Sequence, residues 1–556
     1  SWRLLGSEAP STEFVLYKDG AKLATIDGSG ATNFLDKTGS VTSKYEVAAV
    51  VNGTEGAKEG ATLVFDKTYK EGSMSFPYKE LAVDVPPSGT NPDDGSTYTY
   101  TANDGSLGDL DGDGELEFVV KWDPSNSQDN SKTGFTGNVY LDAYKLSTGK
   151  KMWRIDLGPN IRAGAHYTQY MVYDFDGNGI AEIAVKTGDG AIDGKGNVIG
   201  QAGVKNYANG VILSGNEYLT VFNGLDGSEI TTVDYVPKRD ILPTNSKSAP
   251  PNGWGDNYGN RCERYLAAVA YLDGKKPSLI SWRGYYTAAY VVAWDFDGKS
   301  LKQRWYHKSV TDGIAGQGNH NLSVGDLDGD GFDEIVSGSA ALDHDGKMLY
   351  STGMGHGDAM HLSDLDPDRP GLELWDVHEE TGAKYSDEMR DGMGNVIWGT
   401  LQTGKDNGRG MAADIHPNRG FEMWSGASGG LRTVEGKNLY DAAGNVLAPG
   451  VSTNFRLYFD GDVYDELMDG TKDPSKNNGF TGGSVHKYNW ETNAVDRILT
   501  FANVNGSSLN NWTKNNPCIV ADLIGDWREE FIVRGESANK LTIFTTPYVT
   551  EHRVYT

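Results

Sequence analysis

A short acidic loop recurs six times along this chain of 556 residues and limits the folds that the chain can adopt. Each copy ends in an acidic residue eight or nine positions after its first Asp, and a run rich in branched and aromatic residues follows. An EF-hand closes at loop position twelve and lies between helices. These loops instead precede runs that we predict to be the inner strands of repeated units. The copies start at Asp109 (DLDGDGELE), Asp174, Asp326, Asp364, Asp414 and Asp522.

Two weaker copies raise the number of units to eight. They lie at residues 271–284 and 457–470 and lack the full set of acids. Between the units, strand-like runs joined by turns with Gly often end in Trp or Tyr, as in VVAWDFDGKSLKQRWY. Repeats of about 40 to 60 residues that each form one small antiparallel sheet are typical of a propeller. The sequence therefore predicts an all-β protein in which residues 86–556 form an eight-bladed β-propeller.

The first 85 residues do not share this repeat. The runs FVLYKDGAKLA, TNFLDKTG and SKYEVAAVVNGTEG alternate apolar and polar positions, and a linker with VPPSGTNPDDG follows them. This spacing predicts a small β-sandwich over residues 1–85 that resembles a fibronectin type III module. We expect this domain to be a scaffold rather than the site of the chemistry. The sequence does not show which residues complete the last blade of the propeller.

Composition limits the partners and the covalent framework. The chain has 50 basic and 77 acidic residues, so its net charge of −27 disfavours nucleic acid or an anionic membrane as the main partner. No apolar run is long enough to cross a bilayer. Cys262 and Cys518 allow at most one disulfide and no paired CxxC zinc site. We expect a monomer that is secreted or extracytoplasmic, although no signal peptide precedes Ser1 in this chain.

The acidic loops predict several bound calcium ions. Carboxylates at alternate positions, with Gly to turn the backbone, suit a hard cation that takes about six to eight oxygen ligands. We expect these ions to hold the corners of the blades rather than to take part in chemistry. The candidate ligands are Asp109, Asp111, Asp113, Glu117, Asp174, Asp176, Asn178, Glu182, Asp326, Asp328, Asp330, Glu334, Asp364, Asp366, Asp368, Glu373, Asp414, Asn418, Glu422, Asp522 and Glu530.

Histidines concentrate in a stretch that the repeats do not require, between Gly316 and Arg409. His320 lies in GQGNHNLS, His356 in GHGDAMHLSD, and His378 in DVHEE, at nearly equivalent points of successive units. We expect these points to gather at one end of the propeller. Imidazole and carboxylate groups together bind calcium, manganese or zinc, so a second kind of metal site is predicted here. The residues of these runs that could bind a metal are His320, His356, Asp358, His361, His378, Glu379 and Glu380.

Several long runs resemble one known family over essentially the whole chain. SWRLLG, KWDPSNSQDNS, NIRAGAHYTQYMVYDFDG, AGQGNHNLSVGDLDGDG, STGMGHGDAMHLSDLDP, GRGMAADI and ADLIGDWREE are similar to the rhamnogalacturonan lyases of polysaccharide lyase family 11. The resemblance implies a calcium-dependent enzyme that cuts the bond from rhamnose to O4 of galacturonate in rhamnogalacturonan I, an acidic polysaccharide of pectin. The reaction that it implies is β-elimination, which leaves a 4,5-unsaturated galacturonate end.

The resemblance also assigns roles to single residues. It implies that the calcium of the active site is held by His320, His356, Asp358 and Glu379, that Arg409 faces the galacturonate carboxylate, and that Lys514 is the base or a second clamp on that carboxylate. The chain has Trp512 where we expect the family to have Gly. Candidates for the rhamnose contacts are Asn103, Asp123, Asn511 and Thr513, and further polar groups at this end are Arg162, His166, Arg261 and Arg264.

Alternatives to an endo-acting lyase stay open. An exo-acting lyase of the same family should carry an extra segment that blocks one end of the cleft, yet WGTLQTGKDNGR from Trp398 to Arg409 is compact. The stretch from Lys472 to Gly483 is another candidate for such a cap. A non-catalytic carbohydrate-binding propeller, stabilised by calcium, would share the acidic loops but would not need the histidines. A glycoside hydrolase would use a pair of carboxylates and give saturated products.

Overall fold

The structure, a computed structural model, describes residues 1–40, 42–426, 438–451, 454–472, 480–511 and 514–555. Antiparallel strands make up almost all of its regular elements, in agreement with the all-β prediction. The described residues include two short 3-10 helices, η1 (Arg239–Ile241) and η2 (Phe501–Asn503). In this part of the chain, no helix combines the length and the apolar character that a membrane span needs.

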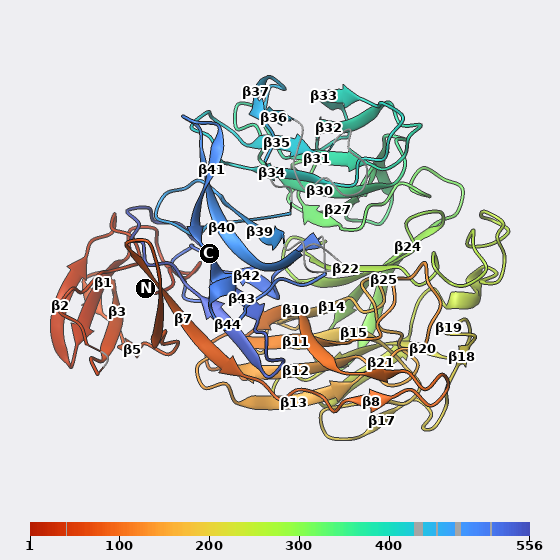
Figure 1. Cartoon of the computed structure of the whole chain (residues 1–556), viewed down its shortest axis with the longest axis horizontal. Coiled ribbons are helices and arrows are strands. Elements are labelled where there is room, and N and C mark those ends of the chain that lie inside the picture. Colours follow the sequence, from red (N-terminus) through yellow and green to blue (C-terminus); the bar gives the residue numbers. More distant parts are fainter. Residues whose placement is uncertain (41, 427–437, 452–453, 473–479, 512–513, 556) are drawn as a thin grey trace.

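The N-terminal domain is built on one five-stranded sheet with the order β2-β1-β3-β4, and β5 pairs with β3. Trp2 and Leu4 pack on Phe14 and Leu16 of β1 and form a small core of their own. Figure 1 shows this domain, in red, beside the larger ring of sheets. The strands are β1 (Glu13–Lys18), β2 (Ala21–Ile26), β3 (Tyr45–Val51), β4 (Thr54–Glu55) and β5 (Glu59–Gly60).

Eight further sheets of four to six strands form the propeller, and we number them as blades 1 to 8 in the chain order of their first strands. First strands of neighbouring blades contact each other, as β10 does β14 and β42, so these strands line the centre of the ring. Blade 1 contains β10 (Tyr100–Gly108), β11 (Glu117–Pro124), β12 (Tyr140–Lys145), β13 (Lys151–Asp156), β16 (Ala191–Ile192) and β17 (Val198–Ile199). Blade 2 contains β14 (Tyr170–Tyr173), β15 (Glu182–Gly188), β20 (Glu217–Phe222) and β21 (Glu229–Asp234), and blade 3 contains β22 (Tyr265–Ala270), β23 (Ser278–Arg283), β24 (Ala289–Phe296) and β25 (Leu301–Ser309). Blade 4 contains β26 (Ser323–Gly325), β27 (Glu334–Ser337), β28 (Ala340–Leu342) and β29 (Met348–Ser351).

The remaining sheets follow the same plan. Two short hairpins, β8 (Gly89–Thr90) with β9 (Thr97–Tyr98) and β18 (Tyr207–Ala208) with β19 (Val211–Ile212), lie outside the blades. Blade 5 contains β30 (Gly357–Ser363), β31 (Glu373–His378), β32 (Tyr385–Asp391) and β33 (Val396–Leu401), and blade 6 contains β34 (Gly410–Ala413), β35 (Glu422–Ser425), β36 (Asn438–Tyr440) and β37 (Val446–Pro449). Blade 7 contains β38 (Phe455–Leu457), β39 (Glu466–Lys472), β40 (Phe480–Asn489) and β41 (Ala494–Leu499). Blade 8 contains β42 (Ile519–Ala521), β43 (Glu530–Arg534), β44 (Lys540–Phe544), β7 (Met74–Ala82) and β6 (Lys67–Glu71).

The acidic loops join the first strand of a blade to the second. The apolar runs that follow the loops are therefore second strands, not the innermost strands that the sequence analysis expected. The second strands β15, β23, β27, β31 and β35 are buried along their whole length. Each of them lies inside a blade whose two faces pack on neighbouring blades, which explains why apolar residues occupy both faces of these strands rather than alternate positions.

Blade 8 closes the ring with strands from both parts of the chain. β44 pairs with β7 in antiparallel register, with Phe544 opposite Tyr78, and β6 forms the outer edge. Phe76 of β7 is fully buried in the core between blades 7 and 8. The sheet pairing thus moves the domain boundary from the expected residue 85 to before Lys67, because residues 67–82 belong to the propeller. Cys262 and Cys518 are both buried and form no disulfide.

Candidate active site and ion-binding loops

One end of the ring collects the polar residues that lie at or before the start of the first strands. His320 precedes β26, His356 precedes β30, which carries Asp358, and Glu379 follows β31, so two adjacent blades supply the predicted metal ligands. Because the blades repeat around a common axis, the starts of their first strands meet at the same end. Other residues placed in this way are His166 before β14, Arg264 before β22, Arg409 before β34, Lys514 before β42 and Asn103 in β10.

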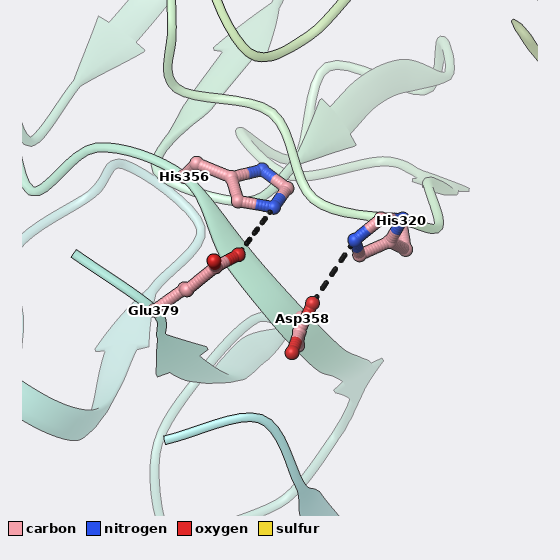
Figure 2. A group of neighbouring side chains, drawn as sticks. All are labelled: His320, His356, Asp358 and Glu379. Atoms are coloured by element: carbon pink, nitrogen blue, oxygen red, sulfur yellow. Dashed lines mark ion pairs between the residues drawn. The ribbon is translucent and has the colours of Figure 1, made fainter. Parts of the chain in front are cut away.

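The four predicted ligands converge in space. One nitrogen or oxygen atom from each of His320, His356, Asp358 and Glu379 lies within 4.8 Å of the others. Nε2 of His320 is 3.0 Å from Oδ1 of Asp358, and Nε2 of His356 is 3.1 Å from Oε2 of Glu379 (Figure 2). Burial lowers the pKa of His320, which favours its neutral, metal-binding form at neutral pH. The four residues predicted together from the sequence thus also lie together in space.

His356 shows why this cluster fits a divalent cation. Its Nδ1 donates to the carbonyl oxygen of Gly318 at 2.5 Å, so in the neutral ring Nε2 carries a lone pair. That Nε2 atom is buried, has no hydrogen-bond partner among the described residues and faces the carboxylate of Glu379. A lone pair facing a carboxylate is unfavourable, whereas a shared cation stabilises both groups. Two imidazoles and two carboxylates suit calcium, manganese or zinc.

Two tyrosines that the sequence analysis did not identify surround the histidines. The hydroxyl of Tyr285 is 3.1 Å from Nδ1 of His320 and 3.3 Å from Nδ1 of His166, and the hydroxyl of Tyr286 is 3.2 Å from Nε2 of His320. The rings of Tyr286 and His356 lie 4.0 Å apart. Both tyrosines come from the weak third repeat, where no acidic motif draws attention to them; the only signal is the aromatic pair directly after SWRG.

Arg409 and Lys514 lie at the same end as the cluster. Arg409 is 6% exposed and donates to the side-chain oxygen of Asn454. Lys514 keeps solvent-accessible surface, yet burial of its ammonium group lowers its pKa; the carboxylate of Asp358 opposes this shift and the guanidinium of Arg409 adds to it. Asp406 also belongs here, since burial together with the charges of Glu379 and Asp358 raises its pKa to about 6.

The predicted rhamnose-binding residues are only partly brought together. Asn103 of blade 1 donates from Nδ2 to the side-chain oxygen of Asn511 at 3.2 Å, across the junction of blades 1 and 8. Asp123 is half-buried, accepts a hydrogen bond from Ser127 and lies opposite Thr101 in the register of β10 and β11. Thr513 lies outside the described residues, as does Trp512.

The additional polar candidates separate into two groups. His166 and Arg264 join the cluster: the His166 ring lies 5.0 Å from that of His320, and the Arg264 guanidinium lies 4.8 Å from the Tyr286 ring. Arg162 instead is buried against backbone carbonyls of Gly134 and Lys132, which gives it a structural role. Arg261 contacts none of the described residues of the cluster, and its role stays a prediction.

The acidic loops share one local design. The closing Glu starts the second strand and is buried, and its Oε2 accepts a hydrogen bond from the backbone of the residue after the first Asp, as Glu334 does from Leu327 at 2.7 Å. In the regular loops the first Asp accepts backbone N–H groups with both oxygens; Asp326 does so from Gly329 and Gly331. The first Asp thus shapes the loop, while the closing Glu keeps one oxygen for another partner.

The loops differ in how closely the predicted ligands approach each other. Two groups with ligand atoms within 4.8 Å are those of Asp109, Asp111 and Glu117 and of Asp174, Asp176 and Glu182. In blade 4, Asp330 and Glu334 are joined by His344, which the sequence analysis did not include. Asp113, Asn178, Asp328, Asp364, Asp368 and Asn418 are exposed, and Asp366 and Asp414 are half-buried.

In the acidic loop of blade 8, groups of the protein itself hydrogen-bond or pair with the carboxylates. Oε1 of Glu530 accepts from the hydroxyl of Thr545 at 2.7 Å and Oε2 accepts from the backbone of Leu523 at 2.9 Å. Asp526 pairs with Arg528, and Asp522 accepts backbone N–H groups of its own turn. The predicted ligand Glu530 therefore has hydrogen-bond donors on both oxygens.

The fold and this site define a class of eight-bladed propellers with a cation-binding cluster, an arginine and a lysine at one end of the ring. Residues 78–556 match the model of the rhamnogalacturonan lyase family 11 C-terminal domain, and residues 1–65 match that of the rhamnogalacturonan I lyase β-sheet domain. The chain belongs to rhamnogalacturonan lyase family 11 and is a rhamnogalacturonan lyase.

Relatives of both known action types are similar to this chain. Rhamnogalacturonan endolyase YesW of Bacillus subtilis strain 168 is 49% identical over 100% of this chain and 83% of its own length. Rhamnogalacturonan exolyase YesX of the same organism is 48% identical over 100% of this chain and 87% of its own length. The crystal structure of YesX superposes with a TM-score of 0.90 at 46% identity, covering 100% of this chain and 89% of YesX. The lyase hypothesis is thereby favoured over the hydrolase and the non-catalytic propeller.

Proposed function

We propose that the protein cleaves the rhamnose-galacturonate bonds of rhamnogalacturonan I by calcium-assisted β-elimination and that it acts in the endo mode. The observation that carries the proposal is the buried Nε2 of His356, which has no hydrogen-bond partner among the described residues and lies 3.1 Å from the carboxylate of Glu379, beside the pair of His320 and Asp358. These four side chains would hold the calcium ion. The ion, when bound, neutralises the uronate carboxylate of the substrate and so makes the proton at C5 more acidic.

Arg409 and Lys514 supply what the elimination requires from the protein. The planar guanidinium of Arg409 suits a carboxylate, and its burial strengthens the interaction with that anion. Lys514 removes the C5 proton, for which its amine has to be neutral; burial and the charge of Arg409 move its pKa in that direction. The C4–O4 bond of galacturonate breaks as the double bond between C4 and C5 forms, and O4 leaves on the rhamnose unit, where it takes up a proton and becomes a hydroxyl.

The charge distribution supports an acidic substrate despite the net charge of −27. Arg264 is buried beside Tyr286 near the cluster and adds its positive charge to those of Arg409 and Lys514. Their buried charges attract a polyanion at close range, while the surface charge farther away is screened by salt. Asn103, Asp123 and Asn511 are proposed to bind the rhamnose unit, and Thr513 with them.

The compact rim beside Arg409 supports endo action. After β33 the chain turns back tightly, and the side-chain oxygen of Gln402 accepts backbone N–H groups of Thr403, Gly404 and Lys405 at 2.7, 3.1 and 3.3 Å. Such a turn leaves no extra segment between β33 and Arg409 to block the path of a long chain. The other candidate cap, from Lys472 to Gly483, lies partly outside the described residues.

The chelation test is direct. Metal-depleted protein is mixed with rhamnogalacturonan I, and the ultraviolet absorbance of the unsaturated product is followed before and after addition of Ca²⁺, Mn²⁺ or Zn²⁺. We expect Ca²⁺ to restore the reaction and His356→Ala to abolish it, whereas His552→Ala, which changes an exposed histidine, has no effect. Activity that survives chelation, or saturated products, would refute the proposed chemistry.

Early product sizes test the mode of action. Size-exclusion chromatography at low conversion should show a rapid fall in polymer length if the enzyme acts in the endo mode. Accumulation of disaccharide from the start, with the polymer length almost unchanged, would contradict it. We also propose that the enzyme is an extracytoplasmic monomer, since weak calcium sites in extracellular modules are filled at the calcium concentrations found there.

A further inference from the structure

The closing glutamates of seven blades use one oxygen in the same way. In each, Oε2 accepts a backbone N–H group of the acidic loop at 2.7 to 3.1 Å, which leaves Oε1 for a different partner. The group that contacts Oε1 differs from blade to blade, so the loops can be divided by this partner. The seven residues are Glu117, Glu182, Glu334, Glu373, Glu422, Glu466 and Glu530.

In blade 7 a lysine takes the central position of the loop. Nζ of Lys487 is 2.6 Å from Oε1 of Glu466, 2.7 Å from Oδ1 of Asp462 and 3.0 Å from Oδ2 of Asp460. The three N–H groups of an ammonium can therefore all point at carboxylates. The side chain is 18% exposed, so most of it is enclosed by the blade.

Blade 1 repeats this arrangement. Nζ of Lys145 is 2.6 Å from Oδ2 of Asp111 and 2.8 Å from Oδ2 of Asp113, and it lies 3.7 Å from Oε1 of Glu117. Both lysines stand at the same place in the blade, because the third strand pairs Lys145 with Glu117 and Lys487 with Glu466. In blade 5 the register places Asp391 opposite Glu373, so this position carries an acid there instead of a base.

Blades 4, 5 and 6 have no such lysine. Oε1 of Glu334, of Glu373 and of Glu422 is buried and has no hydrogen-bond partner among the described residues. Arg369 approaches Glu373 only to 3.9 Å, with a half-exposed side chain. These glutamates are at most 1% exposed. A buried carboxylate oxygen without a partner is costly, and a cation at the centre of the loop removes that cost.

We propose that Lys145 and Lys487 take the place of the metal ion in blades 1 and 7, whereas the loops of blades 4, 5 and 6 bind a divalent cation. The same loop scaffold is thus neutralised either by a side chain of the third strand or by an ion. The proposal rests on the proposed function only in naming calcium as the ion. It replaces the expectation that Asp109, Asp111, Asp113 and Glu117 bind calcium.

The test removes the lysine from the loops of blades 1 and 7, so that an ion can bind in its place. Lys487→Met and Lys145→Met proteins, and the double variant, are passed through gel filtration in calcium buffer, and bound calcium is counted by atomic emission. We expect each single variant to bind one ion more than the wild type and the double variant two more. Lys302→Met is the control, because Lys302 is an exposed lysine paired with Asp297 outside these loops. An unchanged count in Lys487→Met and Lys145→Met overturns the proposal.

Thermal unfolding gives a second readout. With a chelator present, Lys487→Met should melt at a lower temperature than the wild type, and calcium should restore it, since the carboxylates have lost their cation. If the variants do not fold, anomalous diffraction of wild-type crystals at a wavelength where calcium scatters decides instead. Calcium in the loops of blades 4, 5 and 6 but not in those of blades 1 and 7 supports the proposal, and calcium in place of either lysine refutes it.

Failure of the proposed function is distinguishable from failure of this inference. If chelation leaves the lyase active but Lys487→Met gains an ion, only the calcium-assisted chemistry is wrong. If activity depends on calcium but the lysine variants gain no ion, only the inference that Lys145 and Lys487 take the place of an ion is wrong.

Discussion

Replacing Tyr285 with phenylalanine is predicted to weaken the ion site without disturbing the fold. The tyrosine is fully buried, and its hydroxyl lies 3.1 Å from Nδ1 of His320, 3.3 Å from Nδ1 of His166 and 3.4 Å from Nη1 of Arg264. Phenylalanine fills nearly the same volume. The variant therefore removes one partner of His320 and little packing.

The expected loss follows from the contacts that remain. Loss of a partner that orients a metal-binding histidine typically costs about 10- to 100-fold in metal affinity or activity. Tyr286 still contacts Nε2 of His320 at 3.2 Å, so the ring keeps one of its two tyrosine contacts. We therefore expect the lower end, about tenfold, which corresponds to about 1.4 kcal/mol.

The assay is a calcium titration of the initial rate, followed by the ultraviolet absorbance of the unsaturated product in chelator-buffered solutions. The calcium concentration at half-maximal rate should rise about tenfold in Tyr285→Phe, with the rate at saturating calcium close to that of the wild type. Tyr290→Phe is the matched control, since Tyr290 is a buried tyrosine of the same blade that packs on Trp254. An unchanged midpoint in Tyr285→Phe would refute an orienting role for the hydroxyl.

Three further predictions concern the base, the clamp and the closure of the ring. Lys514→Ala should lower kcat/KM by about 10²- to 10⁴-fold. In the wild type, kcat should rise with pH as the ammonium of Lys514 loses its proton, and this rise should occur below the usual lysine pKa because burial lowers the pKa of Lys514. A flat pH profile would exclude Lys514 as the base. Arg409→Lys should lower kcat/KM by about 10- to 100-fold, since the charge stays but the planar fork is lost; wild-type kinetics would exclude a carboxylate clamp. Phe76→Ala should destabilise the protein by about 3 to 5 kcal/mol, because the ring is fully buried in β7, and an unchanged melting temperature would show that β7 does not hold blade 8 closed.

Local sequence signals predicted the repeated part of the fold. The acidic loops and the apolar runs after them lie within single blades, so eight blades could be predicted without knowledge of distant contacts. Closure could not be predicted in this way, because Tyr78 and Phe544 pair across almost the whole chain and neither carries a local sign of its partner. For the same reason, residues 67–82 were assigned to the N-terminal domain.

The site was predictable where chemistry marks a residue. His320, His356 and Glu379 stood out because histidines and carboxylates recurred at equivalent points of neighbouring repeats. Tyr285 did not, since tyrosines are common in this chain and its role depends on reaching a histidine of the next blade. Lys145 and Lys487 were missed because their partners are set by strand register, which the sequence alone does not give.

The shared construction of blade 8 sets an order for maturation during synthesis. Its strands β6 and β7 leave the ribosome early, before blade 1, and β7 lacks its second neighbour until β44 has been made. Asn103 and Asn511, which are hydrogen-bonded across the junction of blades 1 and 8, can meet only after most of the chain has been made. A nascent chain can therefore assemble the histidine cluster of blades 4 and 5 well before the junction of blades 1 and 8 exists, so this end of the ring is complete only with the final strands.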